Sequence, residues 1–421
     1  MIRLVCTLTL LATALPALAD VAIINARIHT MTSEGALDNA TVIVRDGRIA
    51  AVGADIVAPD GIEVIDAAGR HVTPGIFDPL SSLGAVEVSL EESTNDTAHA
   101  GRYGAGFDIS TAINPASSVV GVNLIEGVTR ALVVPSAPWE GGHSVLAGQA
   151  AAVVFGSDPA DVLVRPAAGV VAYLGARGSA MAGGSRAAAM QQLREALEDA
   201  DDYNQHRDDY DEGDRRDYAI TRLDLKALLP VVSGRTPLIV YAERASDLRA
   251  VVELKRDFDL RVIVAGAAEA WMVADLLAAN DVGVILDPFE NLPGSFDSLN
   301  ASMENATRLA AAGVAIAFTQ GDSHNPRNLT QVAGNAVAYG LEWDAALRAI
   351  TVSAPRMLGL GDECCAIVSG ADADLVLWDG DPLDVTSFAD AVFVRGEAVD
   401  MRSRQTLLRD RYRQLLPPVR P

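Results

Sequence analysis

One short strand of this sequence ends at positions suited to holding a metal ion. In TPGIFDPLSSLG, residues 73–84, a Pro-Gly turn leads into an apolar run that ends at Asp78. A strand directs residues i and i+2 to the same face, so positions 80 and 82 could share one ion. A zinc ligand must offer a lone pair at ~2 Å from the metal. The sequence has Leu80 and Ser82 there, and leucine has no lone pair to give.

The elements around this strand predict an α/β fold, a (β/α)8 TIM-like barrel. Short apolar strands alternate with longer helical patterns, which indicates parallel βα units. Four successive strands suit the second half of such a barrel, whose mouth is built from loops after the strand C-termini. These four are TPLIVYAE (236–243), LRVIVAGAA (260–268), DVGVILDPF (281–289) and GVAIAFTQG (313–321), and GVTRALVVPS (127–136) is a further predicted strand before them.

Both ends of the chain are β-rich instead. VAIINARIHT near the start and ADAVFVRGEAVD near the end contain β-branched, alternating segments with tight turns. We therefore expect a small β-sandwich domain built from both chain ends. The expected organisation is a signal peptide (1–19), an N-terminal β-sandwich segment (20–73), the barrel (74–361), a C-terminal β-sandwich segment (362–400) and an amphipathic C-terminal tail (401–421).

The N-terminal sequence and the net charge limit where the protein can be located and which partners it can have. Arg3, an apolar stretch from Leu4 to Leu15 and a small-residue site predict a signal peptide cleaved near Ala19, hence a periplasmic or secreted protein. We expect no membrane span, because the apolar run is shorter than the ~20 residues a span needs. A formal charge of -23 argues against nucleic acid as a partner. The arginine-rich tail is expected to lie on the acidic body or on a partner subunit.

The order of these elements resembles the amidohydrolase superfamily, and more narrowly its exported imidazolonepropionase-like branch. The resemblance is carried by VTPGIFD entering the barrel, GLEWDAALRAITVSAPRMLGL closing it and SGADADLVLWDGDPL returning to the β-domain. It implies a barrel with a β-sandwich made from both chain ends. It also implies hydrolysis of amide or related C–N bonds by a zinc-bound hydroxide.

The same resemblance identifies which residues stand at the metal positions. The histidine pair after the first strand is replaced by Leu80 and Ser82, and Tyr241 and Ala265 stand where strands five and six would carry histidines. The proton-accepting carboxylate after strand eight falls on Gly321, or on its neighbour Asp322 if the alignment slips by one residue. We therefore expect degenerate metal ligands and no zinc cofactor.

A few other polar residues could still form a site at the barrel mouth. Tyr241, Glu243 and His143 are predicted to line a pocket with Leu80 and Ser82. Asp322 and His324 are the candidate catalytic residues. A loop histidine bonded to backbone is the alternative for His143, and a helix N-cap with a polar neighbour is the alternative for Asp322 and His324.

Two functions remain open on the sequence alone. The first is hydrolysis of non-peptide or dipeptide-like C–N bonds by an atypical metal-bound or metal-free arrangement. The second is a protein with little or no hydrolytic activity, which binds a small amide ligand or serves as the silent subunit beside a catalytically intact paralogue. The missing ligand set favours the second function, as a homo-oligomer or as a hetero-oligomer with that paralogue, because whole-chain resemblance supports fold more than chemistry.

Overall fold

The computed structural model describes most of the chain. The predicted signal peptide and two predicted site residues, His143 and Asp322, lie outside the described residues. The described ranges are 20–98, 101–137, 144–156, 159–290, 292–321, 323–361 and 364–413.

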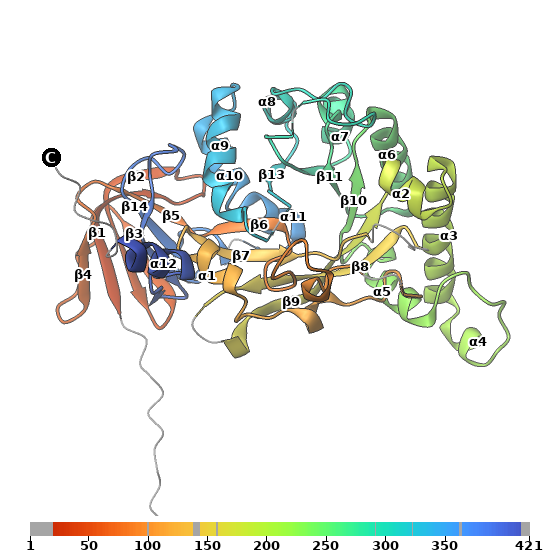
Figure 1. Ribbon diagram of the computed structural model, residues 1–421, viewed down its shortest axis with the longest axis horizontal. Coiled ribbons are helices and arrows are strands. Elements are labelled where there is room, and N and C mark those ends of the chain that lie inside the picture. Colours follow the sequence, from red (N-terminus) through yellow and green to blue (C-terminus); the bar gives the residue numbers. More distant parts are fainter. Residues whose placement is uncertain are drawn as a thin grey trace, which may run out of the picture.

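An eight-stranded sheet forms the central barrel, with helices around it (Figure 1). The strands lie in chain order from β6 to β13, and β13 returns to the side of β6, which nearly closes the barrel. This confirms the predicted TIM-like barrel. Its strands are β6 (Ile76–Ser81), β7 (Val128–Val133), β8 (Leu146–Val154), β9 (Leu163–Tyr173), β10 (Leu238–Ala242), β11 (Val262–Gly266), β12 (Gly283–Leu286) and β13 (Ile316–Phe318).

One strand differs from the regular (β/α)8 pattern. β8 runs antiparallel to both β7 and β9, whereas β9 through β13 are parallel. A parallel neighbour needs a crossover of a dozen or more residues, usually a helix. Only residues 155–162 connect β8 to β9, so the chain must turn straight back. The barrel sheet is therefore mixed, and its regular parallel half contains strands five to eight.

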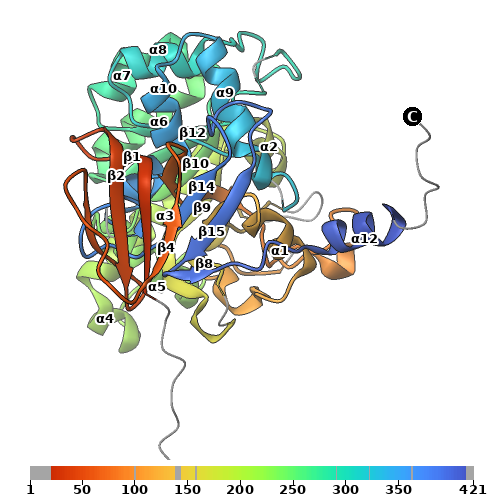
Figure 2. The ribbon, with the colours of Figure 1, turned by 90° about the vertical axis from the view of Figure 1, so that its left-hand side faces the viewer.

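The chain ends form a second sheet beside the barrel, as predicted (Figure 2). β14 from the C-terminal end pairs with β5, and β1 pairs on one edge with β2 and on the other with β4 and β5. The strands hydrogen-bond into a single sheet. They are β1 (Val21–His29), β2 (Ala36–Arg45), β3 (Arg48–Gly53), β4 (Glu63–Asp66), β5 (His71–Pro74), β14 (Leu375–Trp378), β15 (Ala389–Val394) and β16 (Glu397–Ala398).

The helices pack an apolar stripe against the barrel. In α6, Leu248, Val251 and Val252 follow the i, i+3, i+4 spacing and are buried. Within the described ranges, no helix is both long enough and apolar enough to cross a bilayer. The helices are α1 (Ser118–Leu124), α2 (Gly175–Met181), α3 (Arg186–Gln205), α4 (Arg207–Asp211), α5 (Arg222–Val232), α6 (Ala245–Phe258), α7 (Ala274–Ala278), α8 (Asn305–Ala311), α9 (Leu329–Ala338), α10 (Trp343–Ala349), α11 (Ser353–Leu358) and α12 (Arg404–Arg413).

A buried arginine joins the barrel to the second sheet. The Arg130 guanidinium on β7 is 2.6 Å from Asp374 and 2.6 Å from Asp372, both just before β14. Arg130 and Asp374 are almost fully buried, whereas Asp372 also pairs with the exposed Arg48 at 3.5 Å. Removing one partner of a buried pair is costly because the other charge is left in a low-dielectric interior.

We predict that Arg130→Met lowers the free energy of unfolding by ~3–5 kcal/mol, because it leaves Asp374 buried without its cation. Urea titration followed by circular dichroism measures the change. Arg48→Met is the matched control and should cost less than ~1 kcal/mol, because the Arg48 pair is exposed. Equal midpoints for the two variants would show that the buried pair does not join the barrel to the second sheet.

Candidate functional site at the barrel mouth

A cavity of about 490 Å³ opens where the parallel strands end. Its lining comes from the C-terminal ends of β6, β9, β10, β11, β12 and β13, together with the segments after β6 and β7. This is the face where barrels of this type build their sites. The residues that line it are Leu80, Ser81, Ser82, Val86, Ser89, Asn95, Thr97, Val134, Ser136, Tyr173, Tyr241, Glu243, Gly266, Asp287, Glu290, Thr319, Gln320 and Gly321.

Two tyrosines form an aromatic wall of the cavity. Tyr173 on β9 and Tyr241 on β10 are directly opposite in the strand register. Their rings stack with centroids 4.5 Å apart and planes 7° from parallel. Burial, reinforced by the neighbouring Tyr173 phenol, raises the pKa of Tyr241 well above its usual value. Tyr241 therefore enters the cavity as a neutral phenol beside another aromatic face.

Glu243 follows β10 directly and is held over the end of β11. Its Oε2 accepts a hydrogen bond from the Ala268 backbone N–H at 2.9 Å. A Cβ at Gly266 would lie 2.3 Å from Glu243 Oε1, so the glycine leaves the room that this carboxylate occupies. Burial, with smaller effects from Glu290 and Asp297, raises the pKa of Glu243 to about 7. The carboxyl group is thus near half-protonation at neutral pH.

Asp287 is the equivalent carboxylate after β12. Its Oδ1 accepts from the Phe289 N–H at 2.8 Å, and its Oδ2 accepts from the Gln320 side-chain amide at 2.9 Å. Burial, with the charge of Glu290, raises the pKa of Asp287 to about 6. None of the described residues lining the cavity is Lys, Arg or His. The carboxylates there lack the cation that would hold them ionised.

Asp78 closes the barrel below the cavity. The Thr319 hydroxyl after β13 donates to Asp78 Oδ1 at 2.9 Å, and the Gly321 N–H donates to Thr319 Oγ1 at 3.0 Å. Asp78 is completely buried. This chain of hydrogen bonds joins the first and last strands and fixes the position of Gln320 at the mouth.

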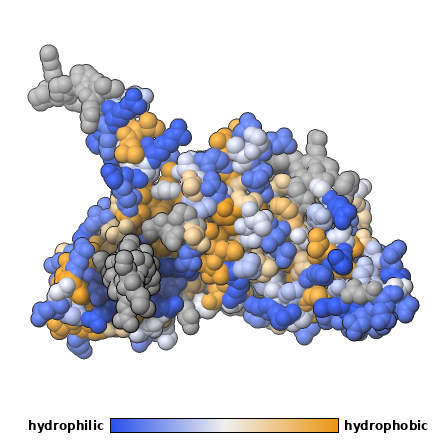
Figure 3. Space-filling model, turned by 90° about the horizontal axis from the view of Figure 1, so that it is seen from below, coloured by the Kyte–Doolittle hydropathy of each residue, from blue (hydrophilic) through white to orange (hydrophobic). Residues whose placement is uncertain are grey.

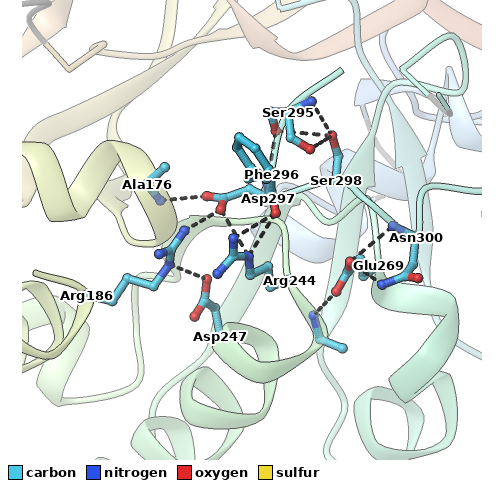
Figure 4. A network of polar contacts seen from close by, with 11 residues as sticks. Ala176, Arg186, Arg244, Asp247, Glu269, Ser295, Phe296, Asp297, Ser298 and Asn300 are labelled. Atoms are coloured by element: carbon cyan, nitrogen blue, oxygen red, sulfur yellow. Dashed lines mark hydrogen bonds and ion pairs between the residues drawn. The ribbon is translucent and has the colours of Figure 1, made fainter. Parts of the chain in front are cut away.

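An ion-pair cluster anchors the loop that carries Glu290 (Figure 4). Asp297 accepts from the Ala176 N–H at 2.7 Å, pairs with Arg244 Nε at 3.0 Å and also binds Arg186. These partners lie on α2, just before α6 and at the start of α3, respectively. The loop after β12 is therefore tied to three surrounding elements.

The structure brings together most of the predicted pocket. Leu80, Ser82, Tyr241 and Glu243 all line the cavity. Ala265 is fully buried in β11, and the lining residue on that strand is its neighbour Gly266. His143 and Asp322 cannot be placed, since they lie outside the described residues.

His324 lies outside the cavity lining. It is half-buried and close enough to Glu87 for its charge to lower the pKa of that glutamate, although hydrogen bonds from Ser117 and Ser118 have the larger effect. The structure thus places His324 beside an acidic loop.

Sequence reasoning missed several residues that dominate the cavity chemistry. Asp287 and Glu290 follow β12 in the run LDPFE, and Gln320 follows β13. Their positions in the sequence could have identified them, because polar residues that directly follow parallel strands all lie at one face of the barrel. Tyr173 was not predicted, because β9 belongs to the irregular first half of the barrel.

No family model matches this sequence. The chain is 24% identical over 393 residues to Amidohydrolase tasK of Hapsidospora irregularis, which covers 85% of this chain and 39% of that protein. It is 32% identical over 106 residues to an adenine deaminase of Clostridium botulinum, covering 25% of this chain and 17% of that protein. The chain thus spans well under half the length of the curated relatives it matches.

Solved structures agree with the fold. An amidohydrolase from Thermotoga maritima MSB8 superposes with a TM-score of 0.80 at 24% identity, covering 91% of this chain and all (100%) of that one. An L-hydantoinase from Arthrobacter aurescens gives a TM-score of 0.52 at 14% identity, covering 92% of this chain and 97% of that one. The barrel and the attached sheet thus have the fold of these amidohydrolase structures, and the chain is similar over most of its length to a curated amidohydrolase.

We predict that the contribution of Glu243 to the free energy of unfolding falls as the pH rises from about 4.5 to about 7, the window between the ordinary and the raised pKa of Glu243. Across it the folded state binds more protons at Glu243 than the unfolded chain does, whereas burial lowers the pKa of His29 to about 4 and gives a contribution of the opposite sign. Glu243→Gln should therefore make the slope of the free energy of unfolding against pH more positive than that of the wild type. Denaturant titrations at a series of pH values measure the free energy of unfolding.

Glu63→Gln, an exposed carboxylate in β4, serves as the control and should keep the wild-type slope. A Glu243→Gln slope identical to that of the wild type would contradict the assignment of a raised pKa to Glu243.

Proposed function

We propose that this chain is an exported, zinc-free member of the amidohydrolase superfamily that binds a small molecule in the barrel-mouth cavity. Its ligand carries a protonated amine, an amidinium or a guanidinium group. Zinc-dependent hydrolysis of C–N bonds is then absent. The observation that carries this proposal is the described lining of the cavity, which combines buried carboxylates with stacked tyrosines and includes no imidazole.

The residue types at the metal positions support a zinc-free site. Leu80 offers only aliphatic carbon, and Ala265 is buried within the sheet. Zinc prefers Cys, His and carboxylate ligands in a closed set. Within the described ranges of the chain, no three His, Cys, Asp or Glu side chains are grouped so that they could hold a metal. The described residues at this site therefore support a zinc-free cavity.

The electrostatics of the cavity support the ligand class. Glu243, Asp287 and Glu290 face the same space, and a bound cation would supply the charge that the two buried carboxylates lack. Tyr173 and Tyr241 add aromatic faces, which attract ammonium and guanidinium groups. A cavity of about 490 Å³ falls within the ordinary size of small-molecule sites.

We predict that protonated amines and guanidinium compounds bind more tightly than neutral isosteres of the same shape. Glu243→Gln together with Asp287→Asn should weaken this binding at least about tenfold, or about 1.4 kcal/mol, because hydrogen bonds to charged groups are lost. Titration calorimetry measures the affinity. Binding should also release protons at pH 7, because the cation lowers the pKa of Glu243 from about 7.

Asp38→Asn removes an exposed carboxylate in β2 and is the matched control, which should leave the affinity unchanged. Equal binding of charged and neutral isosteres, unaffected by the double variant, would contradict the ligand class.

A second function is supported by one observation. A carboxyl group with a pKa of about 7 is well matched to general acid–base catalysis at neutral pH, and Glu243 is such a group at the cavity wall. Metal-free hydrolysis of an amide would then depend on Glu243 and would resist chelators. Assays with cyclic amides and dipeptides, comparing wild type with Glu243→Gln, separate this function from binding alone.

A further inference from the structure

The C-terminal helix α12 stands away from the body of the protein (Figures 2 and 3). No residue of this helix is buried, and the helix it approaches is α1. Leu407 and Tyr412 have exposed fractions of 56% and 58%. Isolated helices shorter than ~12–15 residues are marginal in water, so a 10-residue helix such as α12 needs a packing partner. The described residues of its own chain leave these apolar side chains uncovered.

The segment from Arg402 to Arg413, here called the C-terminal arm, combines positive charge with apolar side chains. It contains five arginines and one acid, Asp410, in a chain whose formal charge is -23. Leu408 and Tyr412 are four residues apart and therefore lie on one face of the helix. The arm is thus complementary to an acidic surface that also offers exposed apolar groups.

Such a surface borders the barrel mouth. Two segments, residues 86–96 and 287–299, line the mouth and are here called the mouth rim. Leu90 is 99% exposed and Phe296 is 82% exposed, and Leu292 is 66% exposed. Each of the two rim segments thus carries at least one large apolar side chain that is exposed to solvent.

The charge of the mouth rim is uniformly negative. Its two segments contain seven carboxylates and no Lys, Arg or His. Asp297 is paired internally with Arg186 and Arg244, whereas Glu91, Glu92 and Glu290 are exposed. The rim therefore offers both negative charge and apolar side chains to a partner, the two properties that the arm complements.

We propose that the C-terminal arm of one copy docks on the mouth rim of a second copy of this chain. Leu408 and Tyr412 would pack against apolar rim residues such as Leu90 and Phe296, while arm arginines face the rim carboxylates. This covers apolar surface on both copies, including the side chains of α12 that α1 leaves exposed. Asp287 and Glu290 belong to both the rim and the cavity, so the docking is tested at Leu90 and Phe296, which do not line the cavity, and it can hold or fail separately from the ligand proposed above.

The test is self-association of the full mature chain, measured by sedimentation equilibrium. The wild type should form dimers or larger assemblies that weaken as salt rises, because salt screens the arginine–carboxylate attraction. Leu408→Ser with Tyr412→Ser in the arm, or Leu90→Ser with Phe296→Ser in the rim, should each weaken association at least about tenfold. Val57→Ser removes an equally exposed apolar residue (84%) elsewhere and should have no effect.

Mixing the two double variants separates docking from misfolding. The arm variant retains an intact rim and the rim variant retains an intact arm, so an equimolar mixture should recover association that neither shows alone. A wild type that stays monomeric, a mixture that does not recover, or an arm that instead sediments with anionic lipid vesicles would overturn the proposal.

Discussion

The partial burial of two carboxylates at the barrel mouth, without a basic side chain in the described lining, is the constraint on which this account of the site depends. Desolvation raises the pKa of Glu243 to about 7 and that of Asp287 to about 6. A carboxylate that is removed from water and lacks a cation is costly to ionise. The cavity therefore favours either the protonated carboxyl groups or a positively charged ligand. Leu80 at an expected ligand position offers no lone pair to a zinc ion, which is why we propose an organic cation as the ligand.

The barrel framework makes this arrangement possible. Parallel strands β9 to β13 end at one face, so residues far apart in sequence, such as Glu243 and Asp287, meet across a few strand spacings. The Asp78–Thr319 hydrogen bond joins the first strand to the last, and the Asp297 ion pairs anchor the loop that carries Glu290. Gly266 matters for a steric reason, because any side chain there would displace the Glu243 carboxylate.

Most of the fold could be predicted from the sequence, and less of the site. Short apolar runs located strands β10 to β13, and turn chemistry identified the β-rich chain ends. The reversed direction of β8 was not predictable, because it depends on the length of a connection in the irregular region. Motif positions singled out four residues that line the cavity, namely Leu80, Ser82, Tyr241 and Glu243. Three other lining residues belong to no motif, and only the assembled strands bring them to the cavity: Asp287, Glu290 and Gln320.

The central claim is that the barrel mouth is a zinc-free binding cavity. Its most direct test is the zinc content of the purified wild-type protein after equilibration with excess zinc and removal of unbound metal, measured by elemental analysis. The account predicts far less than one zinc ion per chain. One tightly held zinc ion per chain, lost when Glu243 and Asp287 are replaced by their amides, would contradict it.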